Sequence, residues 1–269
     1  MPLPQRITIE LTNRCNRSCQ SCPRLKSTYP QGNMTQELYS HLLEQLPDSL
    51  TIVPFFRGES LTHPLFPKMM GQLSRFKQVQ LASNGDCLTL PNQTAILTGC
   101  TFFSLSLHEL LMPWRVPCLQ FLHIARQKGL QTQVSILNNL LQRNIKKRFV
   151  REWQKHVDRV RIYQEHSING FGDMNGESKP LDECSKPNSE MVVYWDGKVG
   201  LCNHDWNNQT YLGDLNFSNI EEVWQSYNYQ RVREWHQSGD RNKVPSCKEC
   251  CFNNKMYGEL YNARQIVHD

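Results

Sequence analysis

Short β-like runs alternate with helical patterns along the first two-thirds of the chain, and this alternation limits the folds that are open to it. Six runs are predicted strands, separated by segments with helical periodicity. They occupy residues 6–12, 50–58, 78–85, 101–108, 131–137 and 157–164. Strands that alternate with helices in this way form parallel sheets with crossover helices. Six units are two short of a closed eight-fold barrel, so we expect an α/β fold with a partial (β/α)6 barrel.

The segments between the predicted strands carry signals for the ends of helices. Thr35 is a predicted N-cap for the helical pattern QELYSHLLEQL that follows it. The pattern CLQFLHIARQKG ends in Gly129, a residue that favours the C-terminal end of a helix. These local signals agree with the strand–helix alternation.

The last third of the chain has a different character. A Gly-, Pro- and acid-rich stretch at 171–184 predicts a linker. After it, Asp196-Gly197 predicts a hairpin turn, and Ser218 with Glu221 predicts a capping box. We therefore expect three parts, a barrel at 1–175, a small second domain at 176–255 and a C-terminal tail at 256–269.

Composition narrows the class of protein. Lys plus Arg number 30 against 25 for Asp plus Glu, an excess too small to predict nucleic-acid binding. No run is long enough to span a membrane, and the N-terminus lacks the apolar region of a signal peptide, so we expect a cytoplasmic protein. In such a reducing compartment, eleven cysteines indicate metal or redox chemistry rather than disulfides. Cys87, Cys100 and Cys118 are isolated and are predicted to be small buried hydrophobic residues.

Cys15, Cys19 and Cys22 follow directly on the first predicted strand, where a barrel carries its active-site loops. Their spacing lets a short loop place three thiolates around one cluster or one metal ion. Thiolates select zinc, copper(I) or iron–sulfur clusters. A structural zinc site needs a fourth ligand, and the next histidine, His41, lies inside a predicted helix. A fourth protein ligand is therefore missing from this segment.

This C-x3-C-x2-C pattern at the end of a first barrel strand resembles the signature of the radical S-adenosylmethionine superfamily. The resemblance implies that Cys15, Cys19 and Cys22 hold three irons of a 4Fe–4S cluster. The fourth iron is then open for the amino and carboxylate groups of S-adenosylmethionine. Cleavage of that cofactor gives methionine and a 5′-deoxyadenosyl radical.

Two further segments are similar to motifs of the same superfamily. Gly58 and Glu59, at the end of the second strand, resemble the motif that binds the methionine amino group. Ser83 and Asn84, at the end of the third strand, resemble the segment that contacts the ribose. One departure is Ser21, where the superfamily usually has an aromatic residue that contacts the adenine.

A second set of cysteines lies in the last third of the chain and closes with a C-x2-C pair. Its members are Cys184, Cys202, Cys247 and Cys250. Four thiolates of this kind describe either a fully ligated iron–sulfur cluster or a closed structural zinc site. The set resembles the twitch domain, a short form of the SPASM domain, which implies one auxiliary 4Fe–4S cluster.

The spacing of the second set is similar to that of dehydrogenases in this subgroup that oxidise an aminocyclitol alcohol. This resemblance implies a small-molecule substrate, a flavodoxin- or ferredoxin-type reductant and an auxiliary cluster that takes the second electron. Those enzymes use an arginine after the sixth strand, whereas this chain has Glu165 and His166 there. Either side chain is a candidate proton acceptor.

Three alternatives remain open from the sequence. A radical epimerase would return hydrogen from a protein thiol, for which Cys251 is the candidate donor. A peptide-modifying enzyme of the same superfamily is the second. The third is a zinc-stabilised binding module without catalytic activity.

Overall fold

The computed structural model describes residues 3–108, 115–141, 143–164, 184–248, 250 and 258–263. The strands are β1 (Arg6–Ile9), β2 (Thr51–Val53), β3 (Gln78–Ser83), β4 (Phe102–Leu107), β5 (Gln131–Leu137), β6 (Arg159–Tyr163), β7 (Glu190–Val193), β8 (Lys198–Gly200), β9 (Gly213–Asp214) and β10 (Glu259–Asn262). The α-helices are α1 (Gln36–Glu44), α2 (Phe66–Gly71), α3 (Leu90–Gly99), α4 (Arg115–Gln127), α5 (Arg143–Trp153), α6 (Lys186–Ser189), α7 (Ile220–Trp224) and α8 (Tyr227–Gln237). Short 3-10 helices are η1 (Pro23–Lys26), η2 (Ser60–Thr62), η3 (Asn138–Leu140), η4 (Arg241–Lys243) and η5 (Pro245–Cys247).

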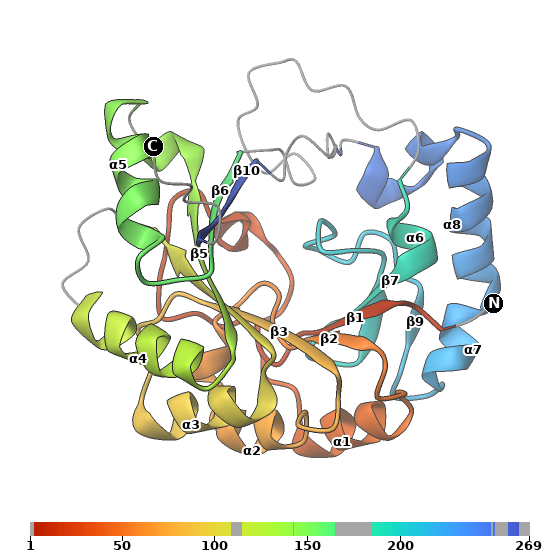
Figure 1. Ribbon diagram of the computed structural model, residues 1–269. Helices are drawn as coiled ribbons and strands as arrows, with labels where there is room; N and C mark the ends of the chain where they lie inside the picture. The colour runs from red at the N-terminus through yellow and green to blue at the C-terminus, as the bar shows by residue number, and fades with distance from the viewer. Residues whose placement is uncertain are drawn as a thin grey trace.

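The described strands form one sheet in the order β10-β6-β5-β4-β3-β2-β1-β7-β8-β9. Strands β1 to β6 are parallel neighbours in chain order, which confirms the partial barrel of six units. Helices α1 to α5 cover the outside of this curved sheet, and α6 to α8 gather beside β7 and β9 (Figure 1). The carboxyl ends of β1 to β6 therefore share one rim, where a barrel carries its functional loops.

The second part of the chain continues the same sheet. Strand β7 pairs in parallel with β1, and β8 and β9 follow as antiparallel neighbours. At the opposite edge, β10 pairs antiparallel with β6, although it lies in the segment that we expected to be a tail. The C-terminal third therefore contacts both edges of the barrel sheet.

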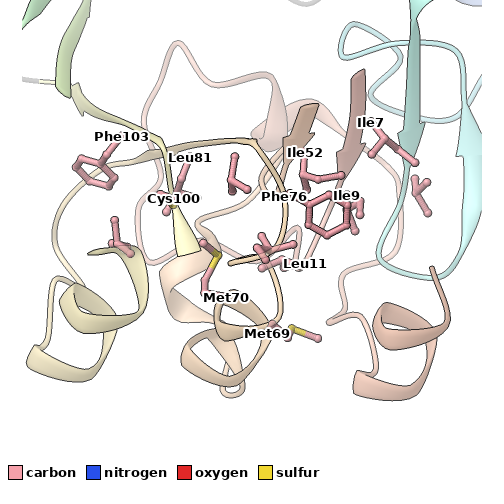
Figure 2. Packing of buried hydrophobic residues seen from close by; sticks show 14 of the residues in the cluster. Ile7, Ile9, Leu11, Ile52, Met69, Met70, Phe76, Leu81, Cys100 and Phe103 are labelled. Carbon is pink, nitrogen blue, oxygen red and sulfur yellow. The ribbon is translucent and has the colours of Figure 1, made fainter. Parts of the chain in front are cut away.

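The outward faces of the barrel strands are apolar and pack against the helices. Ile7, Ile9, Leu81 and Phe103 have no exposed surface, and Met70 of α2 packs into the same core (Figure 2). Branched and aromatic side chains that alternate along a strand fit a sheet covered by helices on one face. This layer supplies the hydrophobic stabilisation of the barrel.

The inward faces of the strands are polar, and this distinguishes the barrel from one with a filled interior. Gln80, Ser104, Ser106, Gln133 and Ser135 line a cavity of about 540 Å³. Closed barrels are filled by branched apolar side chains. Here the interior is a polar lumen that has room for a ligand of the size of a sugar.

Three of the local predictions are confirmed. Thr35 Oγ1 accepts a hydrogen bond from the N–H of Leu38 at the start of α1 (3.2 Å), as an N-cap does. Gly129 and Gly197 have positive φ angles, of 80° and 87°, at the end of α4 and in the β7–β8 hairpin.

The predicted capping box is wrong by one residue. Asn219, not Ser218, caps α7: its side chain accepts from the N–H of Glu222 (2.8 Å), and the Glu222 carboxylate accepts from the N–H of Asn219 (3.0 Å). Glu221, the predicted partner of Ser218, is one residue before Glu222, which forms the capping box with Asn219. Asparagine caps a helix as well as serine does, and the first buried residue, Ile220, fixes where the helix begins.

None of the helices in the described parts of the chain has the length and apolar character needed to cross a bilayer.

Candidate metal and cofactor sites

The loop that follows β1 carries the first three cysteines and is closed at its base by hydrogen bonds. Thr12 Oγ1 donates to the carbonyl of Gly32 (2.9 Å), and Asn13 Nδ2 donates to the carbonyl of Pro30 (2.7 Å). In return, the N–H of Gly32 donates to Asn13 Oδ1 (2.8 Å). We call residues 13–32 the cysteine loop. Its closed base holds it at the carboxyl end of β1.

Within the cysteine loop, Cys15, Cys19 and Cys22 are partly exposed and close enough to influence one another. Burial raises the pKa of Cys19 and of Cys22, the neighbouring thiols raise both further, and Arg17 and Arg24 oppose the rise. Three clustered thiolates are therefore unfavourable by themselves. Coordination of a metal cluster removes this cost, because the metal binds the thiolate form.

The end of β2 contacts the backbone of the cysteine loop directly. The N–H of Glu59 donates to the carbonyl of Arg14 (2.8 Å). A Cβ atom added at Gly58 would lie 2.4 Å from the carbonyl oxygens of Thr12 and Arg14. Real Cβ contacts are never this short, so the approach of these two backbones requires glycine at position 58.

Glu59 joins the ends of β2 and β3. Its carboxylate accepts from the N–H groups of Asn84 (2.8 Å) and Leu61 (3.2 Å), and its side chain also contacts Ser83. Burial raises the pKa of Glu59, although these hydrogen bonds oppose the rise. The structure thus brings Gly58, Glu59, Ser83 and Asn84 together at one rim beside the cysteine loop.

The loop after β3 is tied to the cysteine loop by charged and polar side chains. Asn84 Nδ2 donates to Asn16 Oδ1 (2.9 Å) and lies 4.0 Å from the sulfur of Cys15. Arg17 binds Asp86 through Nε (2.6 Å) and Nη2 (2.5 Å). Burial alone would raise the pKa of Asp86, but the Arg17 guanidinium holds it below its usual range. Three strand ends therefore form one continuous site.

The second set of cysteines meets around a single cavity. Its lining includes Cys184, Cys202, Cys247 and Cys250. The sulfur of Cys247 lies 3.5 Å from Nε2 of His236, and Arg241 donates to the carbonyl of Cys250 (2.8 Å). Burial, and then the neighbouring Cys250, raise the pKa of Cys247 to about 12. These clustered thiols, like those of the first set, are suited to metal coordination.

Both cysteine sets fit iron–sulfur clusters. The first offers three sulfurs, and the cysteine loop contains no further cysteine or histidine. The second offers four sulfurs, with Lys186 and Arg241 in the lining to offset the negative charge of a thiolate-ligated cluster. In the described residues, no group of three or more His, Cys, Asp or Glu side chains is placed to hold a single metal ion.

A buried ion pair lies between the barrel and the second part of the chain. Arg57 donates to Glu10 through Nε (2.7 Å) and Nη2 (2.5 Å), and to the carbonyl of Trp206 through Nη1 (2.6 Å). The guanidinium lies over the rings of Tyr29 and Tyr194, 4.2 Å and 4.3 Å from their centroids. Burial would lower the pKa of Arg57, but the Glu10 carboxylate raises it. One side chain thus links β1, β2, the cysteine loop and the second part.

The polar lumen reaches from the barrel strands to the second cysteine site. At that end it is lined by His204 and Trp206, and on the side of β6 by Tyr163. Lys186 and His204 line both the lumen and the cavity of the second cysteine set. The two cavities therefore share a wall.

Comparison with known proteins identifies an iron–sulfur domain in the last third of the chain and relatives that match nearly its whole length. Residues 184–251 match the family model of SPASM, an iron–sulfur cluster-binding domain. The chain is 26% identical to the S-adenosyl-L-methionine-dependent 2-deoxy-scyllo-inosamine dehydrogenase of Niallia circulans, and the match covers 91% of each chain. It is also similar to BtrN in complex with AdoMet and 2-DOIA, with a TM-score of 0.73, 22% identity and 96% of each chain covered.

More distant structures share the fold. SuiB of Streptococcus suis bound to its precursor peptide SuiA has a TM-score of 0.70 at 12% identity, over 86% of this chain and 67% of that one. Residues 184–251 are therefore a SPASM iron–sulfur cluster-binding domain, and over its whole length the chain is similar to radical S-adenosylmethionine enzymes of that subgroup. Its cofactors are S-adenosylmethionine and 4Fe–4S clusters.

Three residues predicted from the sequence to act in this radical S-adenosylmethionine enzyme lie outside the described residues. They are the candidate proton acceptors Glu165 and His166 and the candidate hydrogen donor Cys251. Ser21, the departure from the usual aromatic residue, is exposed on the cysteine loop.

The isolated cysteines differ in their surroundings. Cys100 and Cys118 are buried in the core, as predicted. Cys87 is only partly buried, and burial, Glu59 and the Cys15 thiolate are among the causes that raise its pKa. Cys87 therefore borders the cofactor site of this radical S-adenosylmethionine enzyme, which its isolated position in the sequence did not indicate.

The contact of Gly58 with the cysteine loop leads to a specific prediction. Gly58→Ala places a methyl group against two backbone carbonyls, so the cysteine loop must shift. We expect the rate of reductive S-adenosylmethionine cleavage to fall by roughly 100-fold, the order expected for a displacement of about 1 Å at a reacting centre. The measurement is 5′-deoxyadenosine formed by the reconstituted enzyme with dithionite.

Gly71→Ala is the matched control. Gly71 ends α2, and an added Cβ would have no heavy atom within 4 Å. This variant should cleave S-adenosylmethionine at the wild-type rate. Equal rates for the two variants would show that the close approach at Gly58 has no part in cofactor chemistry.

Proposed function

We propose that this radical S-adenosylmethionine oxidoreductase oxidises an alcohol of a hydroxylated small molecule, similar to an aminocyclitol or a sugar. The observation that carries the proposal is the polar lumen inside the barrel, which shares Lys186 and His204 with the cavity of the second cysteine set. In functional terms, residues 1–175 form the S-adenosylmethionine part, and residues 176–255 form the auxiliary-cluster part.

The lumen has the chemistry to bind a hydroxylated ring. Gln133 Nε2 donates to Ser104 Oγ (3.1 Å), and Ser135 Oγ lies 3.3 Å from Ser106 Oγ and 3.4 Å from Ser104 Oγ. Hydroxyl groups both donate and accept, so this network can re-form around several ligand hydroxyls. A substrate without hydroxyls could not use these donors and acceptors, so it would gain no hydrogen bonds from them.

We assign Cys15, Cys19 and Cys22 to the cluster that binds S-adenosylmethionine, and the four-cysteine cavity to the auxiliary cluster. When bound, these groups supply a 5′-deoxyadenosyl radical that removes a carbon-bound hydrogen, and an acceptor for the second electron. The wall shared through Lys186 and His204 supports direct passage of that electron from the lumen to the auxiliary cavity. Gly58, Glu59, Ser83 and Asn84 would form the cofactor's other contacts.

The name of the Niallia circulans relative supports an alcohol as the reacting group, since that protein is a dehydrogenase of an inosamine. We propose a flavodoxin- or ferredoxin-type reductant as the electron source. Oxidation of an alcohol also releases a proton, and Glu165 or His166 is the proposed acceptor. No nucleic acid or membrane takes part in this scheme.

Deuterium transfer tests the proposal directly. The reconstituted enzyme is incubated anaerobically with reductant, S-adenosylmethionine and carbon-deuterated cyclitols, aminocyclitols or sugars. Deuterium should appear in 5′-deoxyadenosine when the label is on the carbon that bears the reacting hydroxyl, and the product should be two mass units lighter than unlabelled substrate. Mass spectrometry of both products measures this.

The same experiment separates the alternatives. Deuterium from D₂O in a recovered product of unchanged oxidation state would replace oxidation by epimerisation. A colourless protein with stoichiometric zinc and no sulfide would exclude the enzyme altogether. Transfer of the label only from a peptide would point to peptide modification.

A further inference from the structure

The lumen carries an excess of positive charge among its described lining residues. Four of these residues are cationic, namely Arg6, Arg159, Arg161 and Lys186, and one is a carboxylate, Glu190. Lys186 and Glu190 form an ion pair with each other (3.0 Å). The other three cationic residues of the described lining are arginines.

Two of these arginines lie on the same face of β6. Arg159 and Arg161 are two residues apart on the strand, so both side chains point into the lumen. Burial lowers the pKa of Arg159, and the charge of Arg161 lowers it further. Like charges held this closely in a partly buried cavity repel each other, and an anion bound between them would relieve the repulsion.

Among the described residues, no carboxylate forms an ion pair with Arg159. Its Nη2 donates to Gln131 Oε1 (2.9 Å), and its guanidinium lies 4.6 Å from the centroid of the Phe102 ring. Its Nε is buried and has no hydrogen-bond partner among the described residues. The adjacent carboxylate of Asp158 instead accepts from Thr132 N–H (2.8 Å) and Thr132 Oγ1 (2.9 Å) and forms an ion pair with Arg126 (3.3 Å).

The position of Arg159 and Arg161 on β6 also suits a substrate that reaches the cofactor rim. A strand rises by about 3.3 Å per residue, so Arg161 lies about 7 Å below Tyr163 at the carboxyl end of β6. A sugar-sized ring with one charged substituent has this length. An anion at Arg161 would therefore place the ring beside Ser106 and Ser135, with its far end toward the cysteine loop.

We propose that the substrate is a hydroxylated small molecule that also carries an anionic group, a carboxylate or a phosphate, bound by Arg159 and Arg161. This inference rests on the proposed function and specifies its substrate class. Paired guanidinium groups recognise both kinds of anion through charge-assisted hydrogen bonds. The serine and glutamine network lies level with them in the sheet, on β4 and β5, and binds the hydroxyls.

The test compares four probes on the reconstituted holoenzyme with S-adenosylmethionine bound. The probes are glucose, glucosamine, glucuronate and glucose 6-phosphate, titrated by calorimetry. We expect at least one anionic probe to bind at least about tenfold more tightly than glucose, and glucosamine more weakly than glucose. Comparison of glucuronate with glucose 6-phosphate decides between carboxylate and phosphate.

Variants locate the anion site. Arg161→Gln should remove the preference for the anionic probe, and Arg161→Lys should keep part of it, because lysine retains the charge but not the bidentate geometry. Arg75→Gln is the matched control, since Arg75 is an exposed arginine whose ion pair with Asp48 lies outside the lumen. This variant should retain the full preference.

Two results would overturn the inference. One is a wild-type enzyme that binds glucose or glucosamine as tightly as both anionic probes. The other is an unchanged preference in Arg161→Gln. Reductive cleavage of S-adenosylmethionine, measured in the same samples, distinguishes the two proposals. If S-adenosylmethionine is cleaved but no anionic probe is preferred, only the proposed substrate class is refuted. If an anionic probe is preferred but S-adenosylmethionine is not cleaved, the proposed function is refuted.

Discussion

Cys15→Ala should abolish reductive cleavage of S-adenosylmethionine. Mutation of a residue that only hydrogen-bonds to a metal ligand already lowers metal affinity or activity by about 10–100-fold. Loss of the ligand itself is more damaging. We therefore expect a loss of at least roughly 100-fold in the formation of 5′-deoxyadenosine and methionine. Iron and sulfide should fall to about half of the wild-type content, because the cavity of the second cysteine set is unchanged.

Cys247→Ala is the matched contrast. Cys247 lies in the second cavity, away from the cofactor rim, so cleavage that is not coupled to product should continue. Oxidised product should be lost if the auxiliary cluster takes the second electron. Chromatography of both products from both variants makes the comparison. Normal product formation by Cys247→Ala would refute the electron-acceptor role.

Arg57→Ala is expected to destabilise the enzyme by about 3–5 kcal/mol, because it leaves the carboxylate of Glu10 buried without its partner. The side chains of Arg57 and Glu10 are 1% and 0% exposed. Removal of the guanidinium also removes the contacts with Tyr29, Tyr194 and the carbonyl of Trp206. Urea unfolding of the wild type and the variant measures the difference.

Two variants serve as controls for this experiment. Arg75→Ala breaks an ion pair with Asp48 whose side chains are 41% and 55% exposed, and it should cost less than about 1 kcal/mol. Glu10→Gln combined with Arg57→Met should recover part of the loss, since no unpaired charge remains. An Arg57→Ala protein as stable as Arg75→Ala would show that the buried pair contributes nothing to the fold.

The barrel could be predicted because each of its strands and helices is marked by a pattern within its own short segment of sequence. Alternating apolar residues mark each strand, and caps such as Thr35 mark the helices between them. Pairings between distant segments leave no such mark. Nothing in the local pattern of residues 190–193 indicates a parallel pairing with β1, and a four-residue strand at 259–262 is too short to recognise. The capping box failed because Ser218 and Asn219 are equally good caps by local criteria.

The candidate site was predictable to a similar extent. Cysteine spacing located both clusters of thiols, since metal coordination demands a fixed number of ligands at short range. The polar lumen also has a signal in the sequence, because serine or glutamine recurs at alternate positions in QVQ (78–80), SLS (104–106) and QTQVS (131–135). The partnership of Arg57 with Glu10 was not, because it depends on how β1, β2 and the second part of the chain meet.

The pairing of β1 with both β2 and β7 has a consequence for how this enzyme can be divided. Although two functional parts are recognisable, a cut after residue 164 would leave β1 with one row of unpaired backbone N–H and C=O groups. Such a bare edge invites another chain to add to it, and aggregation follows. The auxiliary part therefore also protects the barrel from self-association, and the two parts are expected to fold as a unit.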